Sequence, residues 1–94
     1  NVATGSIMGI VKGPEGNPLP GVTVTARNLN TGLARTSITD STGVFRLDFL
    51  PSGNYEIRAD LDGFRSQVFS SIKVALGSKQ KLEFTLELSK VEEE

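Results

Sequence analysis

The segment that decides the fold is Tyr55-Glu56-Ile57-Arg58-Ala59-Asp60-Leu61. Apolar and charged residues alternate along it without a break, as in a β-strand that turns one face to a core and the other to water. A shift of one residue would bury the charged side chains, so the pattern also specifies the register. This segment therefore predicts a half-buried strand rather than a helix.

The same alternation recurs on both sides of this segment. The next clearest inward row consists of Leu82, Phe84, Leu86 and Leu88. The stretch from Leu33 to Thr39 alternates ambiguously, as expected of an edge strand. Four shorter inward rows complete the set: Ile7, Gly9 and Val11; Val22, Val24 and Ala26; Phe45, Leu47 and Phe49; Ile72, Val74 and Leu76. The chain is therefore predicted to be all-β, with seven short strands.

Turn-forming residues separate these runs at intervals of about 8 to 12 residues, which is typical of a two-sheet sandwich. The Asp40 side chain is predicted to cap one of these turns. Pro18 and Pro20 lack a backbone donor, so we expect an extended, unpaired lead-in before a strand that begins at Gly21 or Val22. Gly9 takes an inward position, where we expect a large side chain or the opposite sheet to approach closely. The candidate side chains are Phe45, Tyr55, Phe64 and Phe84.

Length and charge limit the possible functions. A chain of 94 residues fits one domain, and a net charge of −1 gives no basic surface for nucleic acid. No apolar run approaches the length that crosses a bilayer, so we expect no membrane insertion by this segment. We predict a lead at 1–4, a sandwich domain at 5–88 and the start of an acidic linker at 89–94. The isolated segment is expected to be monomeric.

The composition argues against an enzyme. Histidine and cysteine are both absent, so the chain cannot assemble a Ser-His-Asp triad, a Cys-His pair or a histidine metal site. A Ser-Lys pair has only solvated lysines to draw on, at outward or turn positions: Lys12, Lys73, Lys79 and Lys81. We therefore expect no catalytic residues and no cofactor.

The aspartates offer one possible metal site. Asp60 and Asp62 share an outward face and Asp40 lies in a turn, so their carboxylate oxygens are candidate calcium ligands. The dense acidic spacing of a calcium loop is missing. The preferred interpretation is that Asp60 and Asp62 are like-charged neighbours on a solvent-exposed strand and that Asp40 caps a turn. No metal site is therefore predicted.

Two features suggest an interaction surface. Met8, Ile10 and Val44 are apolar residues at outward positions, which can mark a contact patch. Scattered apolar residues are also normal on a protein surface, and that is the preferred interpretation. Arg35 lies on the expected edge strand, which can accept a partner strand or be protected by the charge. A sugar-binding surface would need an exposed aromatic ring, and only an exposed Phe64 or Phe69 was expected to provide one.

Several ordered motifs carry a resemblance to a known family. They are Gly5–Val11, Pro18–Val24, Thr39–Phe45, Leu50–Tyr55 and Gly63-Phe64. In this order and spacing the chain resembles the carboxypeptidase regulatory-like domain over about 5–88. The resemblance implies a transthyretin-like, seven-stranded Greek-key β-sandwich that serves as an accessory module of a larger protein.

Among hosts of such domains, the chain is most similar to the N-terminal extension of TonB-dependent outer-membrane receptors of the Oar-like type. Asn28–Leu33 and Val91–Glu94 carry that likeness. It implies a non-catalytic spacer or docking module on the periplasmic side of the outer membrane. Its partners would be the plug and barrel of the same polypeptide or a periplasmic protein. The alternative is a carbohydrate- or peptide-binding module of a secreted or cell-surface protein.

Overall fold

The computed structural model describes residues 4–88 and confirms the predicted seven-stranded β-sandwich. No helix long and apolar enough to cross a membrane occurs within that range. The strands are β1 (Thr4–Lys12), β2 (Thr23–Asn28), β3 (Ala34–Ile38), β4 (Val44–Pro51), β5 (Gly53–Asp60), β6 (Gln67–Val74) and β7 (Lys79–Thr85).

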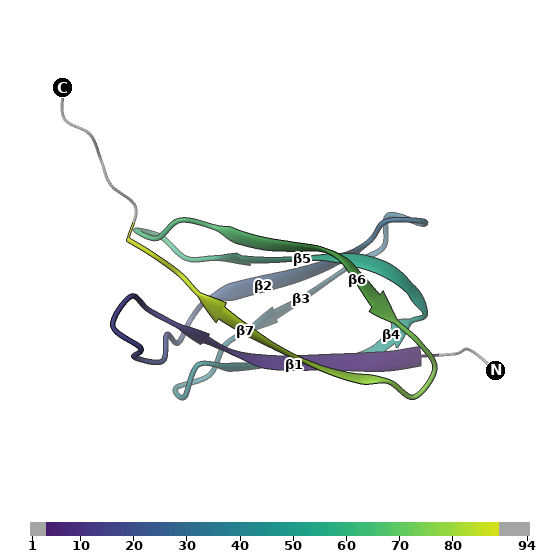
Figure 1. Ribbon diagram of the computed structural model, residues 1–94, viewed down its shortest axis with the longest axis horizontal. Helices are drawn as coiled ribbons and strands as arrows, with labels where there is room; N and C mark the ends of the chain where they lie inside the picture. Colours follow the sequence, from purple (N-terminus) through teal and green to yellow (C-terminus); the bar gives the residue numbers. More distant parts are fainter. Residues whose placement is uncertain (1–3, 89–94) are drawn as a thin grey trace, which may run out of the picture.

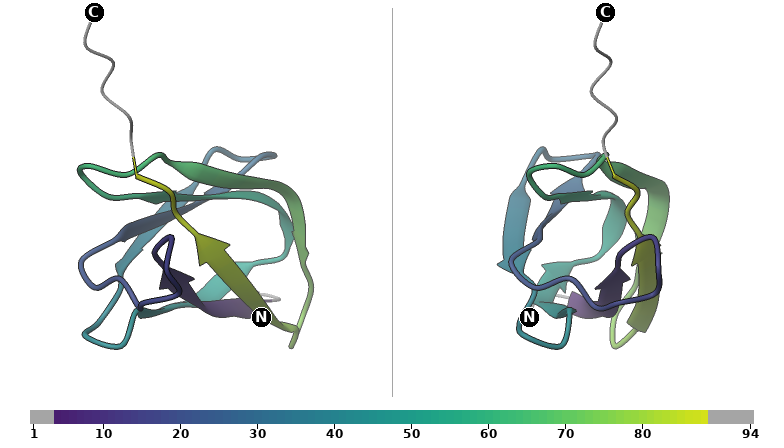
Figure 2. Two further views of the ribbon diagram at one scale, coloured as in Figure 1. Left: turned by 60° about the vertical axis from the view of Figure 1, so that its left-hand side comes forward. Right: turned by 90° about the vertical axis from the view of Figure 1, so that its left-hand side faces the viewer.

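The strands form two sheets that face each other across the core (Figures 1 and 2). One sheet has the order β4-β1-β7, and the other has the order β3-β2-β5-β6. All pairs are antiparallel except β1 and β7, which run parallel from Ser6↔Lys79 to Lys12↔Thr85. As predicted, β3 is an edge strand.

Inward-facing side chains of both sheets build one hydrophobic core. The alternation read from the sequence is visible in β5, where Tyr55, Ile57 and Ala59 are fully buried. Phe84 of β7 lies at its centre, with the Phe45 ring edge-on at 5.8 Å and the Phe69 ring stacked at 4.8 Å between centroids. Both arrangements are favourable for aromatic pairs.

Gly9 permits the close approach that its inward position suggested. A Cβ added there would lie 2.0 Å from the Leu82 carbonyl oxygen and 2.9 Å from Cε1 of Phe45. The missing side chain therefore lets β1 and β7 pair while the Phe45 ring covers the glycine. This confirms the predicted close approach, and of the four aromatic candidates Phe45 is the one nearest to Gly9.

Buried polar groups tie the strand ends to neighbouring loops. The Thr39 hydroxyl accepts a hydrogen bond from Val22 N at 2.9 Å and donates one to the Leu19 carbonyl at 2.7 Å. The Tyr55 hydroxyl donates to the Pro51 carbonyl at 2.6 Å. Within residues 4–88 no buried side-chain polar atom lacks a partner, as a stable core requires.

Three residues predicted to face inward are exposed instead: Phe49 and Leu76 at 73% each, and Leu88 at 60%. Leu76 lies beyond the end of β6, and Leu88 lies beyond the end of β7. Phe49 is displaced by a β-bulge, because Gly5 pairs with Leu50 but Ile7 pairs with Leu47. Two residues of β4 thus oppose one residue of β1, and the inward position passes to Leu50.

The proline lead-in is also less isolated than expected. Pro18 forms a bridge with Lys12, and Leu19 N donates to the Val11 carbonyl at 2.9 Å. The prediction of an unpaired segment was therefore wrong, because the residue between the prolines keeps its own donor. Of the predicted lead, Thr4 begins β1, whereas residues 1–3 and the predicted linker at 89–94 lie outside the described residues.

Candidate functional site

The structure gathers three of the four predicted surface residues on the outer face of the β4-β1-β7 sheet. Ile10 pairs with Val44 in the β1–β4 register, and Met8 lies two residues along the same face of β1. Met8 is exposed, whereas Ile10 and Val44 are half-buried. We call Met8, Ile10 and Val44 the β1–β4 patch.

Charged residues flank this patch. Met8 is opposite Arg46 on β4 and opposite Lys81 on β7. At the far end of the same face, Lys12 and Glu83 form a salt bridge of 3.0 Å. An apolar centre with a charged rim is the usual composition of a protein contact surface.

Arg35 is not part of this patch. It lies on β3, paired with Ala26, at the edge of the other sheet.

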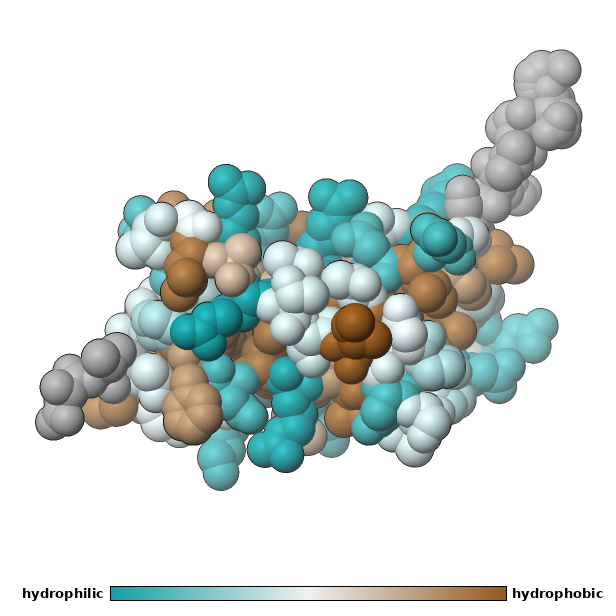
Figure 3. All heavy atoms as spheres, turned by 180° about the vertical axis from the view of Figure 1, so that it is seen from behind, coloured by the Kyte–Doolittle hydropathy of each residue, from teal (hydrophilic) through white to brown (hydrophobic). Residues whose placement is uncertain are grey.

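The face shown in Figure 3 intersperses hydrophobic side chains with hydrophilic ones, so no broad apolar patch covers it. Scattered apolar side chains of this kind are normal on a soluble domain.

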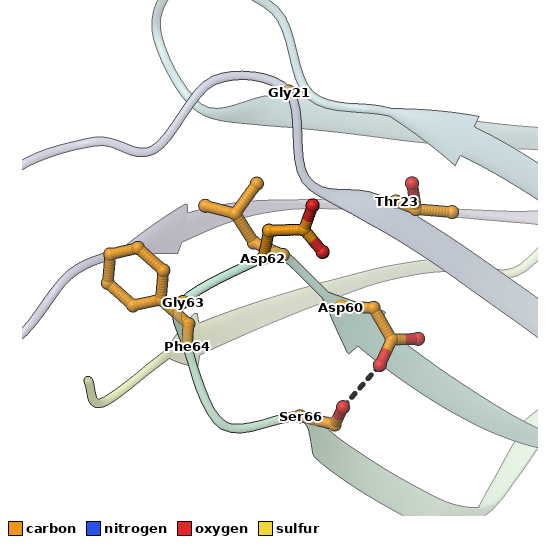
Figure 4. A pocket seen from close by; sticks show the side chains of 8 residues that line it. Gly21, Thr23, Asp60, Asp62, Gly63, Phe64 and Ser66 are labelled. Atoms are coloured by element: carbon orange, nitrogen blue, oxygen red, sulfur yellow. Dashed lines mark hydrogen bonds between the residues drawn. The ribbon is translucent and has the colours of Figure 1, made fainter. Parts of the chain in front are cut away.

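A shallow hollow of about 450 Å³ lies where β5 ends (Figure 4). It is lined by two carboxylates, two hydroxyls, a phenyl ring, a leucine and two glycines: Gly21, Thr23, Asp60, Leu61, Asp62, Gly63, Phe64 and Ser66. The Asp60 carboxylate accepts hydrogen bonds from Ser66 Oγ and, at 3.1 Å, from Arg58 Nε. Its charge is therefore already partly balanced.

The aspartates weighed as calcium ligands do not come together. Asp60 and Asp62 share the hollow, but Asp40 holds its own turn between β3 and β4. In the described part of the chain, no group of three or more histidine, cysteine or acidic side chains is placed to hold a metal ion. Calcium normally takes six or more oxygens, so two carboxylates alone are a poor site.

Asp40 is a turn cap, as predicted. Its Oδ1 accepts hydrogen bonds from Thr42 Oγ1 at 2.7 Å, Thr42 N at 2.9 Å and Val44 N at 3.1 Å. These bonds favour the charged carboxylate, and the Thr42 hydroxyl contributes most to holding the pKa of Asp40 below its ordinary value of 3.8. The turn is therefore most stable when Asp40 is ionised.

Replacing Asp40 by alanine is expected to lower the melting temperature near neutral pH. A depressed folded-state pKa adds stability above the unfolded pKa, and that stability is lost as the pH falls through the folded pKa. The difference in melting temperature between the parent chain and Asp40→Ala should therefore be largest at neutral pH and should shrink below pH 3.8. Thermal unfolding at several pH values measures this difference. Asp62→Ala, at an exposed aspartate of another turn, is the control. A gap that does not change with pH would contradict the assignment.

A second hollow, of about 340 Å³, lies beside Phe49 at the end of the sandwich where β1 begins. We call it the Phe49 hollow. Its other lining residues come from the starts of β1 and β7, from β4 and from the β6–β7 turn: Thr4, Gly5, Ser6, Arg46, Asp48, Gly77, Ser78 and Lys79. Nε of Arg46 and Oδ2 of Asp48 lie 4.0 Å apart. The exposed ring thus stands next to charges and hydroxyls.

The Phe49 backbone is strained. Its φ of 58° lies in the left-handed region, which a bulky residue enters at a cost of about 1 to 3 kcal/mol. Sequence reasoning missed this residue because simple alternation placed it inside. Leu47 and Leu50 are three positions apart instead of the two that strict alternation requires, and Pro51 follows. This spacing was the available sequence signal of a bulge.

The other aromatic candidates are occupied in the core. Phe69 stacks on Phe84, and Phe64 packs against the core cluster, so both rings are half-buried. Neither therefore provides the exposed ring that a sugar-binding surface needs.

Comparisons with known proteins agree with this architecture. A family model described as the carboxypeptidase regulatory-like domain matches residues 6–87. A search of curated proteins found no significant match.

Solved structures with the same fold come from longer proteins. The TIE protein of Bacillus anthracis is 24% identical with a TM-score of 0.75, over 92% of this chain and 17% of that protein. A minor pilin of Streptococcus agalactiae is 16% identical with a TM-score of 0.74, and the match covers 98% of this chain and 48% of the pilin. A candidate carbohydrate-binding protein of Bacteroides uniformis is 19% identical with a TM-score of 0.69, over 88% and 41%.

The chain thus spans less than half the length of each of these three proteins. At identities below 25% the likeness shows a shared fold and nothing about ligands.

Proposed function

This chain belongs to the carboxypeptidase regulatory-like domain family, and on that basis we propose that it is a non-catalytic accessory module. In this proposal it acts as a rigid spacer with a docking face within a longer polypeptide of the bacterial cell envelope. The absence of histidine and cysteine supports the non-catalytic part, because the commonest nucleophile and base combinations cannot form within the chain.

The observation that carries the spacer role is the path of the chain through the sandwich. β1 and β7 lie side by side and point in the same direction along the longest axis (Figure 1). The described chain therefore starts with β1 at one end of the molecule and finishes beyond β7 at the other. A domain inserted in this way separates its neighbours by its own length rather than hanging to one side.

The β1–β4 patch supports the docking role. It lies on the outside of the sheet that contains β1 and β7, so a partner bound there would contact the strands that join the module to its neighbours. Its apolar centre is small, which suits a weak, intramolecular contact better than a permanent complex.

The finer part of the proposal concerns the host. The order of the sequence motifs and the glutamate run at 92–94 support a TonB-dependent outer-membrane receptor of the Oar-like type. In such a host the module lies on the periplasmic side, and its partners are the plug and barrel of the same polypeptide or a periplasmic protein.

The gene that encodes this segment tests the host directly. We expect the reading frame beyond Glu94 to encode a plug followed by a barrel with alternating, roughly ten-residue strands. A frame that continues into a secreted enzyme or a Gram-positive wall anchor would contradict the receptor assignment, and would leave the spacer role to be judged separately.

A further inference from the structure

Phe49 combines two unfavourable features that the fold alone does not explain. Its ring is 73% exposed and its φ is 58°, in a region that glycine or asparagine enters far more easily. The bulge itself has a structural purpose, because it lets Leu47 and Leu50 both face the core. That purpose would be served better by asparagine or glycine at position 49, so the phenyl ring needs another reason.

The ring is also set apart from the other aromatic side chains. Within residues 4–88 it is the only exposed aromatic, since Phe45, Tyr55 and Phe84 are buried and Phe64 and Phe69 are half-buried. Bulges next to binding sites are known to re-aim a side chain. Here the bulge aims an apolar, rigid surface outward at the rim of the Phe49 hollow.

The hollow supplies polar groups around that ring. Ser6 and Lys79 are register partners on β1 and β7, and Arg46 and Asp48 project from β4. Arg46 and Asp48 are weakly paired at 4.0 Å, whereas Lys79 forms no ion pair with residues 4–88. The local charge is therefore positive, and it lies beside a ring that can stack against a flat apolar face.

We propose that the Phe49 hollow binds a carboxylated sugar ring, such as a uronic acid unit of a polysaccharide. The apolar face of the pyranose lies on the Phe49 ring, and its carboxylate accepts charge-assisted hydrogen bonds from Lys79 and Arg46. A single ring beside a hollow of about 340 Å³ suits one sugar unit. A stable protein complex normally buries about 800 Å² on each side, which one exposed ring does not provide.

Calorimetric titration with oligogalacturonate, compared with a neutral cello-oligosaccharide, tests this site. We expect saturable binding of the acidic sugar that weakens with salt, and at most weak binding of the neutral one. Phe49→Ala should lower the affinity about tenfold, the upper range for one aromatic contact. Lys79→Gln should lower the affinity and its salt dependence. Leu76→Ala, at a residue equally exposed but outside the hollow, should leave binding unchanged.

A stability measurement separates binding from packing. If the ring serves a ligand, Phe49→Asn should raise the melting temperature, because asparagine relieves the strained backbone and removes an exposed apolar ring. A lower melting temperature would show that the ring stabilises the fold and would overturn the proposal. Three calorimetric results would also overturn the proposal. They are no binding heat with oligogalacturonate, equal affinity for the neutral sugar, and an unchanged affinity in Phe49→Ala.

Discussion

Gly9→Ala is expected to destabilise the domain by at least about 3 kcal/mol, a large part of the stability of a domain of this size. The new Cβ would lie 2.0 Å from the Leu82 carbonyl oxygen, and both atoms are held by backbone. No side-chain rotation can relieve that contact. The β1 and β7 backbones would have to separate by more than 1 Å, which breaks the parallel ladder on both sides of the substitution.

Gly13→Ala is the matched control for this prediction. Gly13 is also a buried glycine of the same chain segment, but the nearest atom to its added Cβ would be Cδ2 of Leu19 at 3.4 Å, an ordinary contact. Urea unfolding should therefore give a midpoint near that of the parent chain for Gly13→Ala and a much lower midpoint, or no folded baseline, for Gly9→Ala. Similar midpoints for the two variants would contradict the close-approach role of Gly9.

The fold could be predicted well because strand alternation is a local signal. Tyr55, Ile57 and Ala59 alternate with charged residues, and only one register buries them. The segment Tyr55–Leu61 therefore predicted most of β5 from its own residues. The inward position of Gly9 and the turn position of Asp40 were predictable for the same reason, because neighbouring residues indicate both. Resemblance to a family then supplied the order of the strands.

The candidate binding site could not be predicted in the same way. The exposure of Phe49 depends on how β4 pairs with β1, a contact between residues more than forty positions apart. The Phe49 hollow also needs the β6–β7 turn to lie beside the start of β1, where Gly77 N donates to the Thr4 carbonyl at 2.9 Å. The spacing of Leu47 and Leu50 indicates a bulge in β4. Alternation within one strand does not indicate which strand lies opposite that bulge, or which turn lies beside it.

We expect the parallel β1–β7 pair to make the sandwich resistant to force along the line that joins Thr4 and Leu88. Tension on those ends pulls the two strands past each other, so the ladder bonds from Ser6↔Lys79 to Lys12↔Thr85 bear the load together. Further bonds, Ser6 N to the Ser78 carbonyl and Leu86 N to the Lys12 carbonyl, extend this ladder at either end. Forced unfolding depends on the unfolding barrier, and loading many bonds at once raises that barrier.

Pulling from Thr4 and Leu76 instead would load the same strands from one end. Leu76 is exposed in the β6–β7 turn, next to the residue that bonds Thr4. Tension applied there peels β1 from β7 one hydrogen bond at a time. Because the chain has no cysteine, the pairs Thr4→Cys with Leu88→Cys and Thr4→Cys with Leu76→Cys give unique attachment points in the same fold.

Single-molecule pulling of these two variants tests the spacer role most directly. If the module is a rigid element in line with its neighbours, the Thr4–Leu88 pair should unfold in one step at a several-fold higher force than the Thr4–Leu76 pair at the same pulling speed. Unfolding of the Thr4–Leu88 pair at an equal or lower force, or gradual extension without a rupture, would contradict the account.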